Sequence, residues 1–162
     1  MNTLKIKKKI KRAGRKCQIN YLGDNKYLDK KQVEKAACHV ISSYWKLSGL
    51  PPKTFMLDIN VISDKKIKSI NKMYLNRDIV TDVIAFSLQE GVNVPEKESP
   101  LIGQVVISRD AAKRQSVFYK HGVKDEIFIL LIHGLLHVAG WKEGKEIQKC
   151  QKLIKSRLEA QI

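Results

Sequence analysis

The sequence IFILLIHGLLHVAGWKE, residues 127–143, is the most apolar stretch of a strongly basic chain. His133 and His137 are four residues apart, so on a helix their rings lie on one face, one turn from each other. Two imidazoles at that separation can bind one metal ion. Gly140 can end the helix in a left-handed cap, after which the chain can fold back and bring Glu143 to the same point. The stretch predicts a buried central helix that carries a metal site.

The histidine pair also has a plainer interpretation, as two core histidines that are hydrogen-bonded to backbone groups. Gly134 favours the metal site, because it lets another backbone or a ligand approach closely. Three protein ligands with an open fourth position are typical of catalytic zinc, which lowers the pKa of its bound water for hydrolysis. Metalloproteases of the HExxH type carry a glutamate where this chain has Gly134. Phosphodiester cleavage therefore fits this basic chain better than peptide cleavage does.

Three further residues are candidates for the same site. His121 is an alternative third ligand, or it interacts favourably with the dipole at a helix C-terminus. Glu126 shares the helix face of the two histidines, and it either accepts a hydrogen bond from a ligating imidazole or favours the helix N-terminus. Glu146 lies one turn beyond Glu143 and competes with it as a ligand.

The length and charge of the chain indicate the number of domains and the kind of partner. The 162 residues predict one domain with its own core, and 31 basic against 16 acidic side chains give a net charge of +15. This charge favours nucleic acid as a partner, ahead of an anionic membrane surface or a merely lysine-rich, solvated exterior. Tyr74 and Trp141 could stack on bases, with core packing as the alternative role.

Residues 1–16 contain eight basic and no acidic side chains. They predict a flexible basic arm that binds phosphates, or else a solvated tail with no specific role, and they leave residues 17–162 as the folded domain. The three cysteines have no metal-type spacing and predict reduced thiols in a cytoplasmic protein. No signal peptide and no membrane span is expected, because the basic start lacks a following apolar run and the run from 127 to 132 is short.

Capping residues and apolar periodicity predict the other elements. Asp29 and Ser63 are expected to cap helices, Gly122 is expected to end one, and His39 is assigned no chemistry. Strands are predicted near residues 17–22, 55–61, 82–88 and 103–108. Other helices are predicted near residues 29–47, 64–74, 110–120 and 143–162. Together they predict an α/β (α+β) single domain, a mixed sheet of about four strands around the central helix.

The motif His133-Gly-Leu-Leu-His137-Val-Ala-Gly140-Trp resembles HGxLHLxGxDH, the signature of the YbeY endoribonucleases, which are bacterial rRNA maturation factors. Further blocks match in order. Thr81-Asp-Val-Ile-Ala-Phe86 resembles the family's T-D/N-V-L-S-F strand, and residues 102–108 resemble its L-G-D-I-x-I-S strand. The segment Ile70 to Asp78 resembles the family's segment before the first of these strands. The resemblance covers roughly residues 55–150.

The resemblance implies an α/β fold with one zinc ion held by three histidines. It also implies single-strand-specific RNA cleavage in 3′-end maturation of small-subunit rRNA and in ribosome quality control. The implied partners are RNA, chiefly ribosomal RNA, and ribosomal subunits, without a membrane or a small-molecule cofactor. The third histidine of the motif falls on Glu143 and its preceding aspartate on Lys142, so the expected metal ligands are His133, His137 and Glu143.

Two other family positions also differ. The family's loop arginine falls on Leu75, so Arg77, two positions on, is the candidate catalytic residue that would bind phosphate, and the aspartate of the L-G-D strand is Gln104. The leading hypothesis is a zinc-dependent endoribonuclease. The second is a catalytically weak RNA- or ribosome-binding assembly factor on the same scaffold, and the third is a metal-dependent peptidase or other hydrolase.

Overall fold

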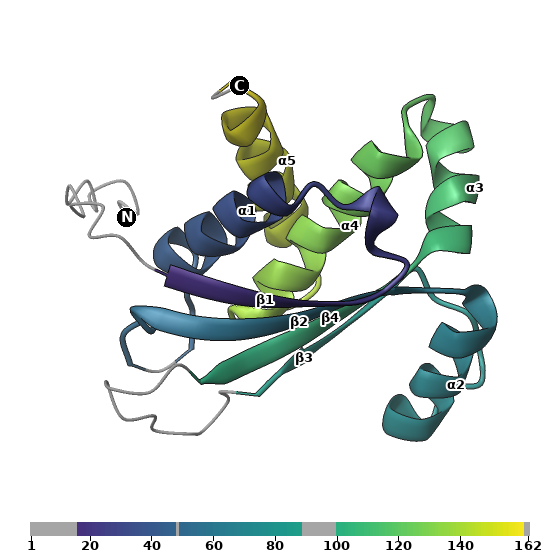
Figure 1. Ribbon diagram of the computed structural model, residues 1–162, viewed down its shortest axis with the longest axis horizontal. Helices are drawn as coiled ribbons and strands as arrows, with labels where there is room; N and C mark the ends of the chain where they lie inside the picture. Colours follow the sequence, from purple (N-terminus) through teal and green to yellow (C-terminus); the bar gives the residue numbers. More distant parts are fainter. Residues whose placement is uncertain (1–15, 48, 89–99, 161–162) are drawn as a thin grey trace.

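A computed structural model describes residues 16–47, 49–88 and 100–160 (Figure 1). The basic arm that the sequence predicts therefore lies, except for Lys16, outside the described residues. The elements follow in this order: β1 (Lys16–Gly23), the 3-10 turn η1 (Asn25–Tyr27), α1 (Lys30–Ser43), β2 (Thr54–Ile62), α2 (Asp64–Leu75), β3 (Val83–Ser87), β4 (Leu101–Ser108), α3 (Arg109–Tyr119), α4 (Val123–Val138) and α5 (Lys145–Glu159).

The four described strands form one mixed sheet in the order β1-β2-β4-β3. β1, β2 and β4 are parallel, and β3 pairs antiparallel with β4. Figure 1 shows α1, α4 and α5 on one face of this sheet, with α2 on the opposite side. The α/β fold with a mixed four-stranded sheet that the sequence predicts is confirmed.

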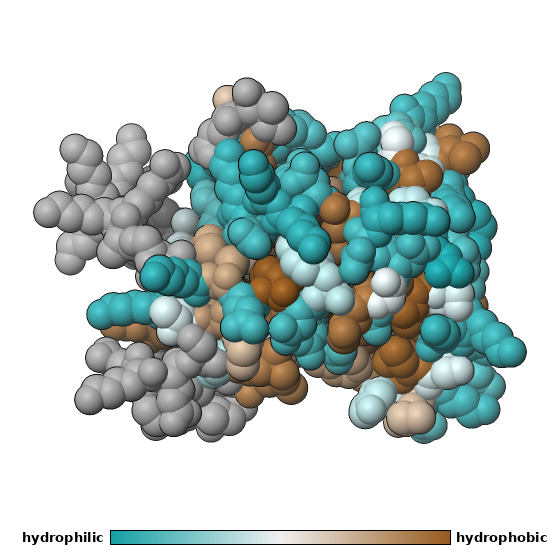
Figure 2. Space-filling view, in the orientation of Figure 1, coloured by the Kyte–Doolittle hydropathy of each residue, from teal (hydrophilic) through white to brown (hydrophobic). Residues whose placement is uncertain are grey.

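Each face of the sheet has its own core. Alternate residues of β2, such as Leu57 and Ile59, point to the larger core beneath α1, α4 and α5. Val106 of β4 points the other way, to a smaller cluster with Ile67 of α2. On the face seen in Figure 2, hydrophilic residues cover most of the surface and apolar residues form separate patches. In the part of the chain that the structure describes, no helix is long and apolar enough to cross a membrane.

The helix α4 lies at the centre of the larger core, as its apolar sequence predicts. Ten of its sixteen residues are buried. Gly134 faces β4, where an added Cβ atom would lie only 2.5 Å from Cγ1 of Val105. A Cβ atom on Gly103 of β4 would similarly lie 2.6 Å from Val138. These two glycines let α4 and β4 pack closely. The element that approaches Gly134 is therefore the strand β4 of the sheet.

Local capping signals are confirmed where the side chain itself makes the cap. The Asp29 carboxylate accepts a hydrogen bond from the Gln32 backbone N–H at 3.0 Å, and the Ser63 hydroxyl accepts one from Lys66 at 3.4 Å. These bonds satisfy backbone donors that a helix N-terminus leaves unpaired.

Three predicted boundaries are wrong. The stop predicted at Gly122 is wrong: α3 ends at Tyr119, the left-handed Lys120 (φ 56°) is its C-cap, and Gly122 instead is the N-cap of α4. The first predicted helix ends at Ser43, because Tyr44 and the residues after it bind the end of α4: the Lys46 backbone N–H donates to the Ala139 carbonyl at 2.8 Å. The last helix begins at Lys145, so Glu143 lies in the turn before it.

Candidate metal centre

The turn after α4 reverses the chain direction over the helix. Gly140 adopts φ 96°, its N–H donates to the His137 carbonyl at 3.0 Å, and the Trp141 N–H donates to the Leu136 carbonyl at 3.0 Å. This pair of bonds is a Schellman motif, which needs a left-handed residue and so favours glycine. The left-handed cap predicted at Gly140 is confirmed, and it carries Glu143 back toward the two histidines.

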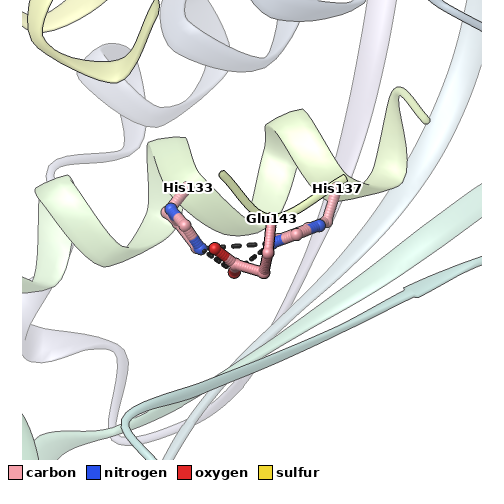
Figure 3. A group of neighbouring side chains, drawn as sticks. All are labelled: His133, His137 and Glu143. Carbon is pink, nitrogen blue, oxygen red and sulfur yellow. Dashed lines mark hydrogen bonds and ion pairs between the residues drawn. The ribbon is translucent and has the colours of Figure 1, made fainter. Parts of the chain in front are cut away.

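Three side chains converge beside this turn (Figure 3). The Nε2 atoms of His133 and His137 lie 3.1 Å apart, and the Oε1 atom of Glu143 lies 2.7 Å from each of them. Their ligand atoms lie close enough together for one metal ion to contact all three. The structure thus brings together the three residues that the motif positions select.

The other ring nitrogen of each histidine has a partner. His137 Nδ1 lies 2.9 Å from the Trp141 backbone carbonyl, which can only accept, so Nδ1 carries the proton. His133 Nδ1 lies 2.9 Å from Oε1 of Gln151 in α5, which likewise accepts. In a neutral imidazole, Nε2 is then a bare lone pair. Two nitrogen lone pairs and a carboxylate oxygen face one point, and such a group is stable only around a proton or a metal cation.

The separations between these atoms fit a metal ion. Ligands about 2.0–2.1 Å from a tetrahedral zinc ion lie roughly 3.3 Å from each other. The observed 2.7 and 3.1 Å are slightly shorter, so small rotations of the side chains would admit the ion. His133 and His137 are 17% and 25% exposed and Glu143 is 67% exposed, which leaves one side of the group open. Two histidines with one carboxylate and an open position are typical of catalytic zinc sites.

Electrostatics keeps the carboxylate of Glu143 ionised. When a proton rather than a metal ion fills the group, burial raises the pKa of Glu143, but hydrogen bonds and then charge from His133 and His137 lower it by more, so its pKa lies below the ordinary value for glutamic acid. An ionised carboxylate is the form that binds a metal cation.

A cleft of about 360 Å³ opens in front of these three side chains. Its walls come from the end of α2, from β3, and from the loop between them, and they include Asn71, Leu75, Arg77, Ile79 and Asp82. Arg77 is exposed in this cleft, so its guanidinium can reach a phosphate there. Leu75, at the position of the family's arginine, gives the same wall an apolar side chain.

Asp82, the other acid that lines the cleft, is held in structural hydrogen bonds. Its Oδ1 accepts from the Val83 backbone N–H at 2.8 Å, and its Oδ2 accepts from Nε2 of Gln115 at 2.9 Å. These bonds tie the start of β3 to α3. Glu143 is therefore the acid of the cleft wall that faces the histidines.

Neither His121 nor Glu126 joins the group. The imidazole of His121 contacts the buried carboxylate of Glu126 and stacks on Tyr119 at 6.0 Å between ring centroids. The expectation that Glu126 accepts a hydrogen bond from a ligating imidazole is wrong, because it lies two helical turns, about 10 Å, before His133. The prediction of His121 as a ligand is also wrong, because its Nε2 atom is held by Glu126 and the group of possible ligands consists of His133, His137 and Glu143.

The competing ligand Glu146 also lies apart. It is 84% exposed, and its carboxylate lies 3.8 Å from Nζ of Lys46. Trp141 has a packing role: its Nε1–H donates to the Tyr44 carbonyl at 2.7 Å, and Lys46 Nζ lies 3.6 Å from its ring centroid. Tyr74 is exposed and meets Phe86 edge to face at 5.6 Å, so its ring remains accessible.

Gln151 is the residue that the sequence analysis missed. It lies four residues after Ile147 and three before Ile154, within the apolar stripe of α5, and it is half-buried. A polar residue inside such a stripe needs a partner there. Its position in the stripe could have indicated a buried polar contact. Only the packing of α5 on α4 identifies His133 as the partner.

Three comparisons relate the sequence and fold of this chain to known proteins. The model of the family described as Endoribonuclease YbeY matches residues 18–159. The solution structure of TM1509 from Thermotoga maritima has the same fold, with a TM-score of 0.59 over 89% of this chain and 91% of that one, at 20% identity.

Curated relatives named Endoribonuclease YbeY match at the sequence level. The protein of Oceanobacillus iheyensis is 38% identical over 95 residues, which are 56% of this chain and 62% of that protein, so the match spans less than two thirds of its length. The protein of Macrococcus caseolyticus is 30% identical over 130 residues, which are 79% of this chain and 83% of that protein. The protein of Desulforamulus reducens is 35% identical over 120 residues, 70% and 78% of the two chains.

Proposed function

Because this chain belongs to the YbeY endoribonuclease family, we propose that it is a zinc-dependent endoribonuclease that cleaves single-stranded RNA. One observation carries the proposal: His133, His137 and Glu143 direct three lone pairs to one point at the wall of an open cleft. We propose these three residues as the ligands of a single zinc ion. A bound zinc ion would supply a water of lowered pKa and polarise a phosphate oxygen.

The protein's own groups have separate tasks in this proposal. Gln151 and the Trp141 carbonyl hold the Nδ1 protons of the two histidines, and so present both Nε2 atoms to the metal. Arg77 is the proposed catalytic residue: it binds the phosphate in the cleft and stabilises the negative charge that develops there.

We propose ribosomal RNA as the substrate, with roles in the 3′-end maturation of small-subunit rRNA and in ribosome quality control in the cytoplasm. A net charge of +15 supports a polyanionic partner, and ribosomal subunits are the proposed assemblies. Residues 1–16 are proposed as a basic arm that adds affinity for phosphates. Deleting residues 1–15, which keeps Lys16 in β1, removes seven basic side chains and should flatten the salt dependence of RNA binding. An unchanged salt slope would remove the arm from this proposal.

A second candidate function is a catalytically weak RNA- or ribosome-binding assembly factor. Leu75 favours it, because the cleft wall carries an apolar side chain where the family has an arginine. In this case the protein would bind zinc and RNA, while cleavage would be slow or absent.

Metal content and RNA cleavage together separate these functions. The purified full chain should hold about one zinc ion, and Glu143→Gln should lower that content, whereas Glu146→Gln should leave it unchanged because Glu146 pairs with Lys46 outside the group. His133→Ala should abolish cleavage of a single-stranded RNA while RNA binding persists.

The other outcomes are equally clear. Zinc without cleavage would select the assembly factor, and a protein that binds no zinc would overturn the ligand assignment. Cleavage that survives in His133→Ala would place the activity elsewhere.

A further inference from the structure

Two of the three cysteines, Cys17 and Cys38, meet at the edge of the larger core. The Sγ atoms of Cys17 and Cys38 lie 3.3 Å apart, and the Cys38 S–H donates to the Cys17 sulfur. Cys17 lies near the start of β1 and Cys38 near the middle of α1, and Figure 1 shows α1 packed over β1. The contact therefore joins two elements that are distant in the sequence.

The spacing is close to what a disulfide needs. A disulfide bond is about 2.0 Å long, so the two sulfurs need to approach by roughly 1.3 Å, which small χ1 rotations can supply. Both side chains are partly exposed, so a small oxidant can reach them. Among the described strands β1 is an edge strand, paired with β2, so it can shift more easily than an internal strand.

We propose that Cys17 and Cys38 form a dithiol site that a low-molecular-weight disulfide oxidises to an intramolecular disulfide between β1 and α1. This site is independent of the proposed ribonuclease function. The new bond would fix the strand β1, which begins at Lys16, the last residue of the basic stretch 1–16.

The reaction is a pair of thiol–disulfide exchanges. The thiolate of Cys38 attacks one sulfur of the oxidant, the oxidant's S–S bond breaks, and one small thiolate leaves. Cys17 then loses its proton to solvent and attacks the sulfur of Cys38, which releases the second small thiolate. The protein loses two hydrogen atoms, and the oxidant is reduced to two thiols.

The order of attack follows from the contacts of Cys17. The close contact with Cys38 and, next, burial raise the pKa of the Cys17 thiol. Its S–H also points to the Glu34 carbonyl, at 3.7 Å. In the proposed order Cys38 makes the first exchange, and Cys17, whose S–H is directed to the Glu34 carbonyl, closes the disulfide.

The third cysteine provides a matched control. Cys150 lies on α5 and is partly exposed like the other two, but its charged neighbours are Lys46 and Glu146. Cys150→Ser should leave formation of the disulfide unchanged, and it also removes the competing thiol.

The test uses the full chain with Cys150→Ser, equilibrated with glutathione disulfide and glutathione at several ratios. Intact mass should fall by two hydrogen atoms, and a peptide joining Cys17 to Cys38 should appear in a non-reducing digest. Dithiothreitol should reverse both changes. The folded protein should close the bond faster than the protein in urea, because the fold holds the two sulfurs together.

Replacing one cysteine at a time tests whether the second thiol displaces glutathione from the first. In Cys17→Ser and in Cys38→Ser, the remaining thiol should keep a stable glutathione adduct, because no second thiol displaces it. Stable adducts on both cysteines of the Cys150→Ser protein, or two thiols that remain open to alkylation at the most oxidising ratio, would overturn the proposal. This readout needs no variant at Cys17 or Cys38, so it stands even if either replacement impairs folding.

Discussion

The Nδ1 atom of His133 in α4 lies 2.9 Å from the Oε1 atom of Gln151 in α5. This bond determines which ring nitrogen of His133 faces the cleft, because a carbonyl oxygen fixes the proton on Nδ1. The last helix therefore contributes to the metal centre through the orientation of a ligand, although it carries none of the three ligands.

Gln151→Leu should weaken zinc binding by about 10- to 100-fold, because His133 loses the acceptor that fixes its tautomer and ring orientation. A competition titration with a chromophoric chelator measures this change. Gln148→Leu, on the exposed side of the same helix, is the control and should bind zinc as the unmodified protein does. Equal affinity in the two variants would show that the hydrogen bond contributes nothing to the site.

Leu75→Arg should raise cleavage of single-stranded RNA, by roughly tenfold in kcat/KM, because it places a cation in the cleft beside Arg77. Met73→Arg adds the same charge to an exposed position of α2 that does not line the cleft. The Met73 variant should raise RNA affinity only as much as one added positive charge does, and it should leave kcat unchanged. A rate increase of the same size in both variants would attribute the effect to net charge.

Gly134→Ala should lower the free energy of unfolding by about 1–3 kcal/mol, because the new methyl group would overlap Val105. Urea denaturation of the variant measures the loss. In the double variant with Val105→Ala, the methyl group gains space, so the combined loss should be smaller than the sum of the two single losses. Strict additivity would contradict the proposed contact between α4 and β4.

The stability of the fold should depend on the ionisation of Asp64, at the start of α2. Its carboxylate accepts hydrogen bonds from Arg114 at 2.7 Å and from the Ser108 hydroxyl at 2.6 Å. The Arg114 bond is the largest cause of the lowered pKa of Asp64, and the Ser108 bond adds to it against the opposing effect of burial. Because the folded pKa lies below the unfolded value of about 3.9, this stabilisation is present above that pH and is lost as the pH falls through the folded pKa.

Asp64→Asn should therefore unfold at lower urea concentration than the unmodified protein at pH 6, and the two midpoints should converge below about pH 4. Asp58→Asn is a control on β2, where the carboxylate pairs with the amide of Asn20 instead of a cation. A difference between Asp64→Asn and the unmodified protein that stays constant from pH 6 to pH 3 would exclude the charge as its cause.

Much of this protein is determined locally. The side chains of Asp29 and Ser63 cap their helices within three residues, and the histidine spacing places both rings on one face of α4. Gly140 adopts the left-handed conformation that the sequence predicts and brings Glu143 back to the histidines. Such features depend on backbone dihedral angles and on contacts within one or two turns, so the sequence was enough to predict them.

Other features depend on how distant elements pack. The helix α1 ends at Ser43 because the residues after it form hydrogen bonds with Trp141 and Ala139. Glu126 pairs with His121 because the turn before α4 brings the two side chains together. Gln151 reaches His133 across 18 residues, and Cys17 reaches Cys38 from another element. No local periodicity encodes these pairs, since their distances are set by the burial of α1, α4 and α5 against one sheet. The sequence by itself determined the three proposed metal ligands, and only the tertiary structure decided which groups hold them in place.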